Sequence, residues 1–175
     1  TASRCHAGWD IDSPFDSFPL PWRQNAGLAC ETDVGLPVLI FADDPACERT
    51  LAGLSVLERL IIAAHEAGAT AISIQQGEME PKFTALARLK IEVHLTRDEP
   101  ALHEPTLLIP GNLALQRTDL ERVMNKQGRL HGPGHELLPC GVAMEWAGSL
   151  EASLPRRPKV EALGVAQPVK DGLTA

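Results

Sequence analysis

The chain has 175 residues, 44% hydrophobic and 22% charged, which are the proportions of a globular domain with one core. No stretch approaches the roughly 20 consecutive apolar residues that span a bilayer, and residues 1–10 lack the charged and then apolar pattern of a secretion signal. The net charge of -7 argues against a nucleic-acid-binding protein, which normally carries a basic face. We therefore expect a cytoplasmic protein without a nucleic-acid partner.

Residues 1–36 show neither helical nor strand periodicity and are rich in proline, glycine and acidic residues. We expect an irregular arm there. Its aromatic side chains could pack on the domain itself or dock a protein partner; they are Trp9, Phe15, Phe18 and Trp22.

Regular patterns begin at Leu36. The unbroken apolar run of residues 37–42 predicts a strand buried on both faces, as in a parallel sheet. Ser55 and Glu58 form a capping box, because each side chain can accept the other residue's free N–H, and this predicts the start of a helix. Helical spacing of apolar residues follows up to Gly68, a typical helix stop; these residues are Leu57, Leu60, Ile61 and Ala64.

The next elements repeat this alternation. Residues 69–74 predict a second strand, and Pro81 opens a predicted helix with Phe83, Leu86 and Ala87 on one face. Residues 91–95 and 106–109 predict two further strands. A second capping box, Thr118 to Glu121, predicts a helix that ends near Gly128, and a last strand is expected at 137–138 or 142–144. This order predicts an α/β domain over residues 37–154 with a three-layer, Rossmann-like, mostly parallel sheet.

Residues 155–175 are rich in proline and locally basic, which is typical of a linker or tail. The four cysteines (Cys5, Cys30, Cys47 and Cys140) are scattered and form no CxxC pair. We expect reduced thiols rather than disulfides or a zinc site.

Ligands of open α/β sheets bind at the carboxyl ends of strands, here the loops after Ala42 and Ile109. Asp43 and Asp44 occupy the first loop and Asn112 the second. Two carboxylates would repel a phosphate, whereas carboxylate oxygens are ligands that Mg²⁺ prefers. The alternative is a solvated turn capped by aspartate and proline.

Three segments together resemble the opening βαβ unit of the sugar-phosphate nucleotidyltransferases, a GT-A-like fold: residues 38–42, 51–60 and 67–69. The resemblance implies a nucleotide site formed by Ala42, Asp43, Asp44, Gly53 and Asn112. It also implies that Asp43, Asp44 and Asn112 would hold Mg²⁺, and that Arg49, near the position of the family's catalytic lysine, would stabilise charge.

The chain departs from the family at two independent places. Asp43 to Ala46 stand where the family has a glycine-rich loop, and the neutral Asn112 stands where it has a metal-binding aspartate. An amide supplies no charge to a cation that must offset triphosphate repulsion. We therefore expect a catalytically degenerate domain.

A second resemblance lies at the end of the chain. Residues 171–175, Asp-Gly-Leu-Thr-Ala, are similar to the start of the CDP-alcohol phosphatidyltransferase signature, Asp-Gly-x-x-Ala-Arg. It implies a membrane domain after the tail, with this domain at the cytoplasmic face of the membrane. The basic tail would also favour anionic headgroups. The leading hypothesis is an accessory domain in the synthesis of phospholipids or polyol-phosphate lipids.

Two alternatives stay open. The first is an active, Mg-dependent nucleotidyltransferase that joins CTP or another nucleotide to a sugar or polyol phosphate and makes an NDP-sugar or CDP-polyol. The second is a protein-binding module that docks through the N-terminal arm.

Other reactive residues have simpler interpretations. His131, His135 and Glu136 surround Gly-Pro-Gly, which forbids the helix of a zinc motif and indicates a flexible turn. Cys47 lies near Arg49, but no histidine base is indicated that would make it a nucleophile. His65 and Lys82 are expected at the surface.

Overall fold

The computed structural model describes residues 35–78, 81–132, 134–163 and 167–169. The predicted arm, apart from its last two residues, and the Asp171–Ala175 segment lie outside the described residues.

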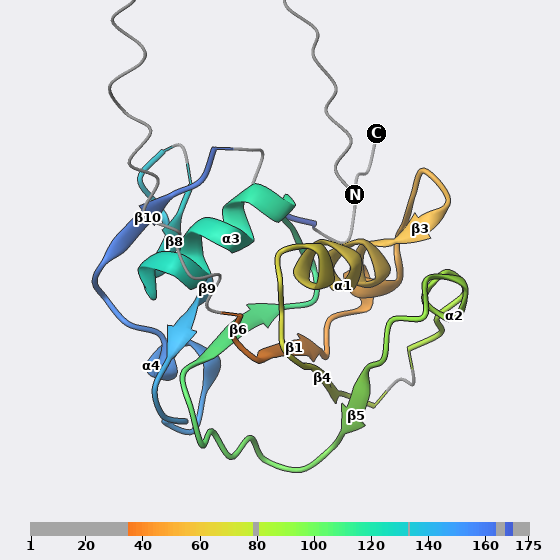
Figure 1. The fold of residues 1–175 in the computed structure, drawn as a ribbon, viewed down its shortest axis with the longest axis horizontal. Helices are drawn as coiled ribbons and strands as arrows, with labels where there is room; N and C mark the ends of the chain where they lie inside the picture. Colours follow the sequence, from red (N-terminus) through yellow and green to blue (C-terminus); the bar gives the residue numbers. More distant parts are fainter. Residues whose placement is uncertain (1–34, 79–80, 133, 164–166, 170–175) are drawn as a thin grey trace, which may run out of the picture. The chain divides into compact units, whose positions relative to one another are not determined.

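A seven-stranded mixed sheet forms the centre of the domain, in the order β10-β8-β9-β6-β1-β4-β5 (Figure 1). Only β9 runs antiparallel to its neighbours in this sheet. The strands are β1 (Val38–Ala42), β4 (Ile72–Gln76), β5 (His94–Thr96), β6 (Thr106–Pro110), β8 (Arg129–His131), β9 (Leu137–Ala143) and β10 (Lys159–Glu161). The predicted α/β class with a mostly parallel sheet is confirmed.

Two short antiparallel pairs and five helical segments complete the described fold. The pairs are β2 (Thr50–Leu51) with β3 (Leu54–Ser55), and β7 (Leu113–Ala114) with β11 (Gln167–Pro168). The helical segments are η1 (Pro45–Glu48), α1 (Val56–Glu66), α2 (Leu86–Leu89), α3 (Arg117–Lys126) and α4 (Leu150–Ser153).

The two faces of the sheet are covered unequally. Val38 and Ile40 of β1 share the main core cluster with apolar residues of α1 and α3, which lie on one face (Figure 1). Leu39, on the opposite face, joins a smaller cluster with Leu108, Ala143 and Leu154. The single helical turn of α4 packs at that cluster, so the second face carries far less helix than the predicted three layers.

The capping box of α1 is confirmed. The Ser55 hydroxyl accepts from the Glu58 N–H at 3.0 Å, and Glu58 Oε2 accepts from the Ser55 N–H at 3.2 Å. The four predicted core residues of this helix are buried, and Gly68 follows its end with φ +89°. Local capping and apolar spacing therefore suffice to define α1.

The predicted helix at Pro81 is wrong, because only one helical turn, α2, forms five residues later. Glu58 Oε1 accepts from the N–H groups of Thr84 and Ala85 at 2.6 and 2.8 Å. These contacts with α1 hold the segment in a non-helical path. Leu86 is buried as expected, whereas Ala87 is exposed.

The prediction of a second capping box at Thr118 and Glu121 is also wrong. The helix α3 begins earlier, at Arg117, and its N-cap residue Gln116 makes no side-chain cap. Asp119 is instead fully buried, and its Oδ1 accepts from the Leu163 N–H at 2.7 Å. Glu121 forms an ion pair with Arg117 on the same helix. The end of α3 near Gly128 is confirmed, with Gln127 at φ +46° as the last cap.

Strand positions shift by up to three residues from the predictions. The strands expected at 69–74 and 91–95 lie at Ile72–Gln76 and His94–Thr96, and both proposed positions of the last strand contribute to β9. Part of the predicted tail belongs to the sheet: β10 pairs parallel with β8, and its Val160 is buried. The strand is only three residues long and directly follows a proline-rich stretch, so the alternation of buried Val160 and Ala162 was too short to indicate it.

Cys47 and Cys140 are free and buried, whereas Cys5 and Cys30 lie outside the described residues. None of the helices within the described ranges is long and apolar enough to cross a membrane.

Candidate functional site at the ends of β1 and β6

The chain order of the sheet reverses between β1 and β6. From β1 the chain adds β4 and β5 on one side, then returns to add β6 on the other. Ligands of open α/β sheets bind in the crevice at the carboxyl ends of the strands at such a reversal. Asp43 and Asp44 follow β1 there, and Asn112 follows β6.

Asp44 and Asn112 meet directly across this crevice. The Asn112 side-chain amide donates to Asp44 Oδ2 at 2.6 Å, and Asp44 Oδ1 accepts from the Ala46 N–H at 2.8 Å. Asp44 is thus the N-cap of η1, and its backbone oxygen also accepts from the Cys47 N–H at 3.0 Å. Two N–H groups of the β1–η1 loop therefore donate to Asp44 itself.

Gly111 permits this approach of the two strand ends. Its N–H donates to the Phe41 oxygen at 2.7 Å. A Cβ at this position would lie 2.9 Å from Cys47 Sγ, closer than real Cβ atoms approach packed neighbours, and 3.0 Å from the Phe41 oxygen, which is unusually tight. The glycine therefore places Asn112 within reach of Asp44.

A cavity of about 730 Å³ opens at the crevice. Its polar wall consists of Asp43, Asp44, Gln75, Gln76 and Asn112. Its apolar wall consists of Phe41, Pro110, Pro139, Trp146, Leu150 and Pro168. None of these described lining residues is lysine, arginine or histidine.

The structure groups four of the six predicted site residues. Ala42 lines a neighbouring cavity of about 410 Å³ together with Asp43 and Asp44, and Asn112 lines the larger one. Gly53 lies instead in the β2–β3 turn at φ +87° and lines a separate, smaller cavity. Arg49 is the half-buried C-cap of η1, outside the described lining of both cavities at the crevice.

The oxygen atoms of Asp44 and Asn112 are not arranged as ligands of the Mg²⁺ that the family resemblance implies. Both Asp44 oxygens already accept from N–H groups, and Asn112 directs its amide nitrogen, not its oxygen, at Asp44. Within the described residues no group of three or more His, Cys, Asp or Glu side chains could hold a metal ion. For Asn112 to hold Mg²⁺ beside Asp43 and Asp44, its amide would have to turn its oxygen inward, which breaks the Asp44–Asn112 contact.

Cys47 has the environment of a structural thiol. Burial raises its pKa to about 12, and the charges of Asp44 and Asp43 act in the same direction. A thiol with such a pKa is almost entirely protonated at neutral pH, so it is a poor nucleophile.

The segment that contains His131, His135 and Glu136 is only partly the predicted turn. His131 belongs to β8 and is buried, and no described residue bonds its Nε2. The Gly132 N–H donates to the Glu136 oxygen and the His135 N–H to the Gly132 oxygen, which closes a turn after the strand. His65 and Lys82 are exposed, as expected.

Sequence reasoning missed the remaining lining residues. Gln75 and Gln76 are the last two residues of β4 and the first two beyond the predicted end of that strand. In the parallel register they lie opposite Phe41 and Ala42. Trp146 stacks on Phe41 with ring centroids 5.5 Å apart and 18° between the planes. The parallel register could have indicated the glutamines, but nothing local indicates where the loop with Trp146 folds.

No family model and no curated protein matches this chain. Among solved structures, the chain is similar to the one described as Rv0371C in complex with manganese, from Mycobacterium tuberculosis H37Rv. The identity is 12%, the TM-score is 0.42, and the similarity covers 73% of this chain and 86% of that chain.

Proposed function

We propose that this chain is a catalytically degenerate, nucleotidyltransferase-like accessory domain that does not transfer nucleotides. The observation that carries the proposal is the position of the Asp44 carboxylate. It accepts the Ala46 N–H and the Asn112 amide at the mouth of the crevice, where a phosphate-binding loop would direct its donors at the ligand. The Asp44 side chain therefore occupies hydrogen-bond donors that a bound phosphate would need.

Electrostatics supports the same proposal. Asp43 and Asp44 line both cavities, and no described lining residue of either cavity carries a positive charge. A carboxylate about 4 Å from a phosphate oxygen raises the energy by on the order of 4 kcal/mol at an effective dielectric constant of about 20. Without a cationic side chain, the crevice disfavours a triphosphate.

A turnover assay tests the proposal. The chain is incubated with CTP or ATP, Mg²⁺ and a panel of sugar and polyol phosphates, and pyrophosphate release is measured. We expect no release above the rate without protein. Release at an enzymatic rate would contradict the proposal, especially if Asp44→Ala abolished it and Glu92→Gln, a remote exposed carboxylate, did not.

Pyrophosphate release at an enzymatic rate would favour the second candidate, an active transferase. The observation in its favour is that Asp43, Asp44 and Asn112 converge on one crevice. Under that candidate, Asp44→Ala also removes Mg-dependent nucleotide binding and leaves the fold intact.

The link to CDP-alcohol phosphatidyltransferases is a separate proposal, supported by residues 171–175. It predicts that the coding sequence places Arg directly after Ala175, followed by further spaced aspartates among hydrophobic helices. Any other continuation, or a stop codon, would contradict the link without bearing on the crevice.

A further inference from the structure

The cavity at the β1–β6 crevice offers hydrogen-bond acceptors and negative charge. Asp43 is exposed in its lining and makes no hydrogen bond or ion pair with any described residue. The neighbouring cavity adds Glu48 and Glu78 to the carboxylates around Asp43. Arg97 binds one lining residue, since its Nε donates to Gln76 Oε1 at 3.4 Å, but it is not itself in the described lining. The unpaired charge of Asp43 favours a ligand of opposite sign.

The lining of the same cavity also includes an aromatic pair. Phe41 and Trp146 both line the cavity and are stacked on each other. The Trp146 indole N–H donates to Glu99 Oε1 at 3.1 Å, which fixes its ring. An aromatic face attracts an organic cation through its quadrupole, and most strongly where water is partly excluded. A carboxylate and an aromatic pair in one cavity are therefore matched to an ammonium group and mismatched to a phosphate.

We infer that this cavity binds a small organic ammonium compound, with Asp43 as its counter-ion and the Phe41–Trp146 pair as its apolar wall. Carboxamides of Gln75, Gln76 and Asn112 lie along the same lining, where they could hydrogen-bond polar substituents of the ligand. The inference rests on the proposed absence of nucleotidyl transfer, because a working transferase would place its nucleotide in this crevice.

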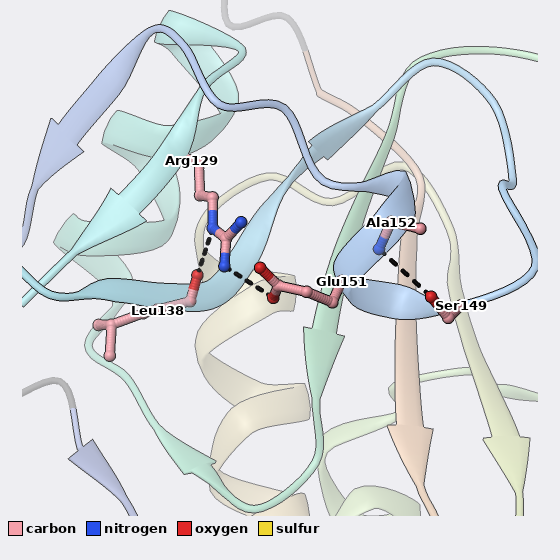
Figure 2. Close-up of polar contacts among 5 residues, drawn as sticks. All are labelled: Arg129, Leu138, Ser149, Glu151 and Ala152. Carbon is pink, nitrogen blue, oxygen red and sulfur yellow. Dashed lines mark hydrogen bonds and ion pairs between the residues drawn. The ribbon is translucent and has the colours of Figure 1, made fainter.

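The part of the apolar wall that α4 contributes is anchored to the sheet. Leu150 of α4 lines the cavity, and the next residue, Glu151, binds Arg129 of β8 at 2.8 Å. Arg129 also donates through Nε to the Leu138 oxygen of β9 at 2.9 Å, so the guanidinium joins α4 to two strands (Figure 2). Ser149 caps the turn by accepting from the Ala152 N–H. A preformed wall spares the ligand the cost of ordering it.

The test compares a cation with its neutral twin. Choline is titrated into the full chain by calorimetry at low ionic strength, beside the isostere in which carbon replaces the ammonium nitrogen. Ethanolamine and spermidine extend the panel to primary and multiple ammonium groups. We expect at least one ammonium compound to bind, the neutral isostere to bind at least about tenfold more weakly, and binding to weaken as the ionic strength rises from about 0.05 M to about 0.5 M.

Variants then test the separate contributions of the carboxylate and of the aromatic pair to binding. Asp43→Asn keeps the shape of an exposed side chain and should weaken binding about tenfold or more, whereas Glu92→Gln, the matched remote carboxylate, should leave it unchanged. Trp146→Leu should weaken binding and Trp146→Phe should restore most of it. Thermal unfolding of each variant identifies any loss of folding, and Asp43→Asn alone suffices if Trp146→Leu does not fold.

Three results would overturn the inference: equal binding of choline and its neutral isostere, unchanged affinity in Asp43→Asn, or no binding of any ammonium compound. Each leaves the proposed absence of turnover untouched, because that proposal is contradicted only by pyrophosphate release. Conversely, release of pyrophosphate together with loss of ammonium binding would contradict both.

Discussion

At the scale of single residues, Glu58 at the N-terminus of α1 accepts more hydrogen bonds than any other described carboxylate. Its two oxygens accept from the Ser55 hydroxyl and from the N–H groups of Ser55, Thr84 and Ala85. Burial by itself raises the pKa of Glu58, but these hydrogen bonds outweigh it and the pKa lies below its ordinary value. One side chain thus caps a helix and fixes a loop 26 residues away.

Glu58→Gln should lower the free energy of unfolding at pH 7 by about 1 to 3 kcal/mol, because buried N–H groups lose a charged acceptor. A carboxylate with a lowered pKa stabilises the fold above its unfolded pKa of about 4.3 and ceases to do so as the pH falls through the folded value. Urea unfolding of wild type and variant from pH 7 to pH 3 should therefore converge at acid pH. A difference that stays constant over this range would contradict the role of the charge.

Because of His131, the free energy of unfolding should fall on mild acidification. Burial lowers its pKa, and the charges of Lys159, His135 and Arg129 add to the effect. Below the ordinary pKa of about 6.5 the unfolded state binds the proton more readily than the folded state, so stability decreases as the pH falls from there toward the lowered folded value.

Substitution of His131 tests this dependence. His131→Leu should flatten the change in unfolding free energy between pH 7.5 and pH 5.5, whereas His65→Gln, at an exposed histidine, should preserve it. A wild-type slope that survives His131→Leu would assign the effect to another group.

At the scale of elements, the Arg129–Glu151 contact has two unequal partners. Arg129 is 4% exposed and Glu151 is 69% exposed. Solvent screens the ion pair at its acidic end, whereas the bond from Arg129 to the Leu138 oxygen is buried.

The two truncations should therefore differ. We expect Glu151→Gln to cost less than about 1 kcal/mol and Arg129→Gln about 2 to 3 kcal/mol, because the second leaves a buried carbonyl without its donor. Denaturant unfolding of both variants measures the difference. Equal losses would mean that the ion pair with Glu151, rather than the buried hydrogen bond to Leu138, accounts for the contribution of Arg129 to stability.

Sequence reasoning succeeded for elements whose signals are local. The capping box and apolar spacing define α1, and the unbroken apolar run defines β1. It failed where a long-range contact decides the conformation, as when Glu58 holds residues 84 and 85 away from a helix. The Thr118 to Glu121 pattern failed because α3 starts two residues too early for Thr118 to cap it.

At the scale of the whole described domain, the topology of the sheet decides which distant residues meet. The reversal of strand order brings Asp44 and Asn112 together across 68 residues of sequence, and the sequence had placed both in one candidate site because each follows the end of a strand. The alternative of a turn capped by aspartate anticipates the bond from the Ala46 N–H to the Asp44 carboxylate. The sequence could not predict that the Asn112 amide would bond the other oxygen of this carboxylate, nor that Trp146 would line the crevice. Trp146 lies in a loop that has no periodic signal.

The central claim is that the Asp44 carboxylate fills the place of a phosphate, so that the crevice takes no nucleotide. Calorimetric titration of CTP with Mg²⁺ into the full chain tests it most directly. We predict no saturable heat for wild type, and the same result with Mg²⁺ alone. Saturable, Mg-dependent binding of CTP that Asp44→Ala removes and Glu92→Gln keeps would contradict the claim.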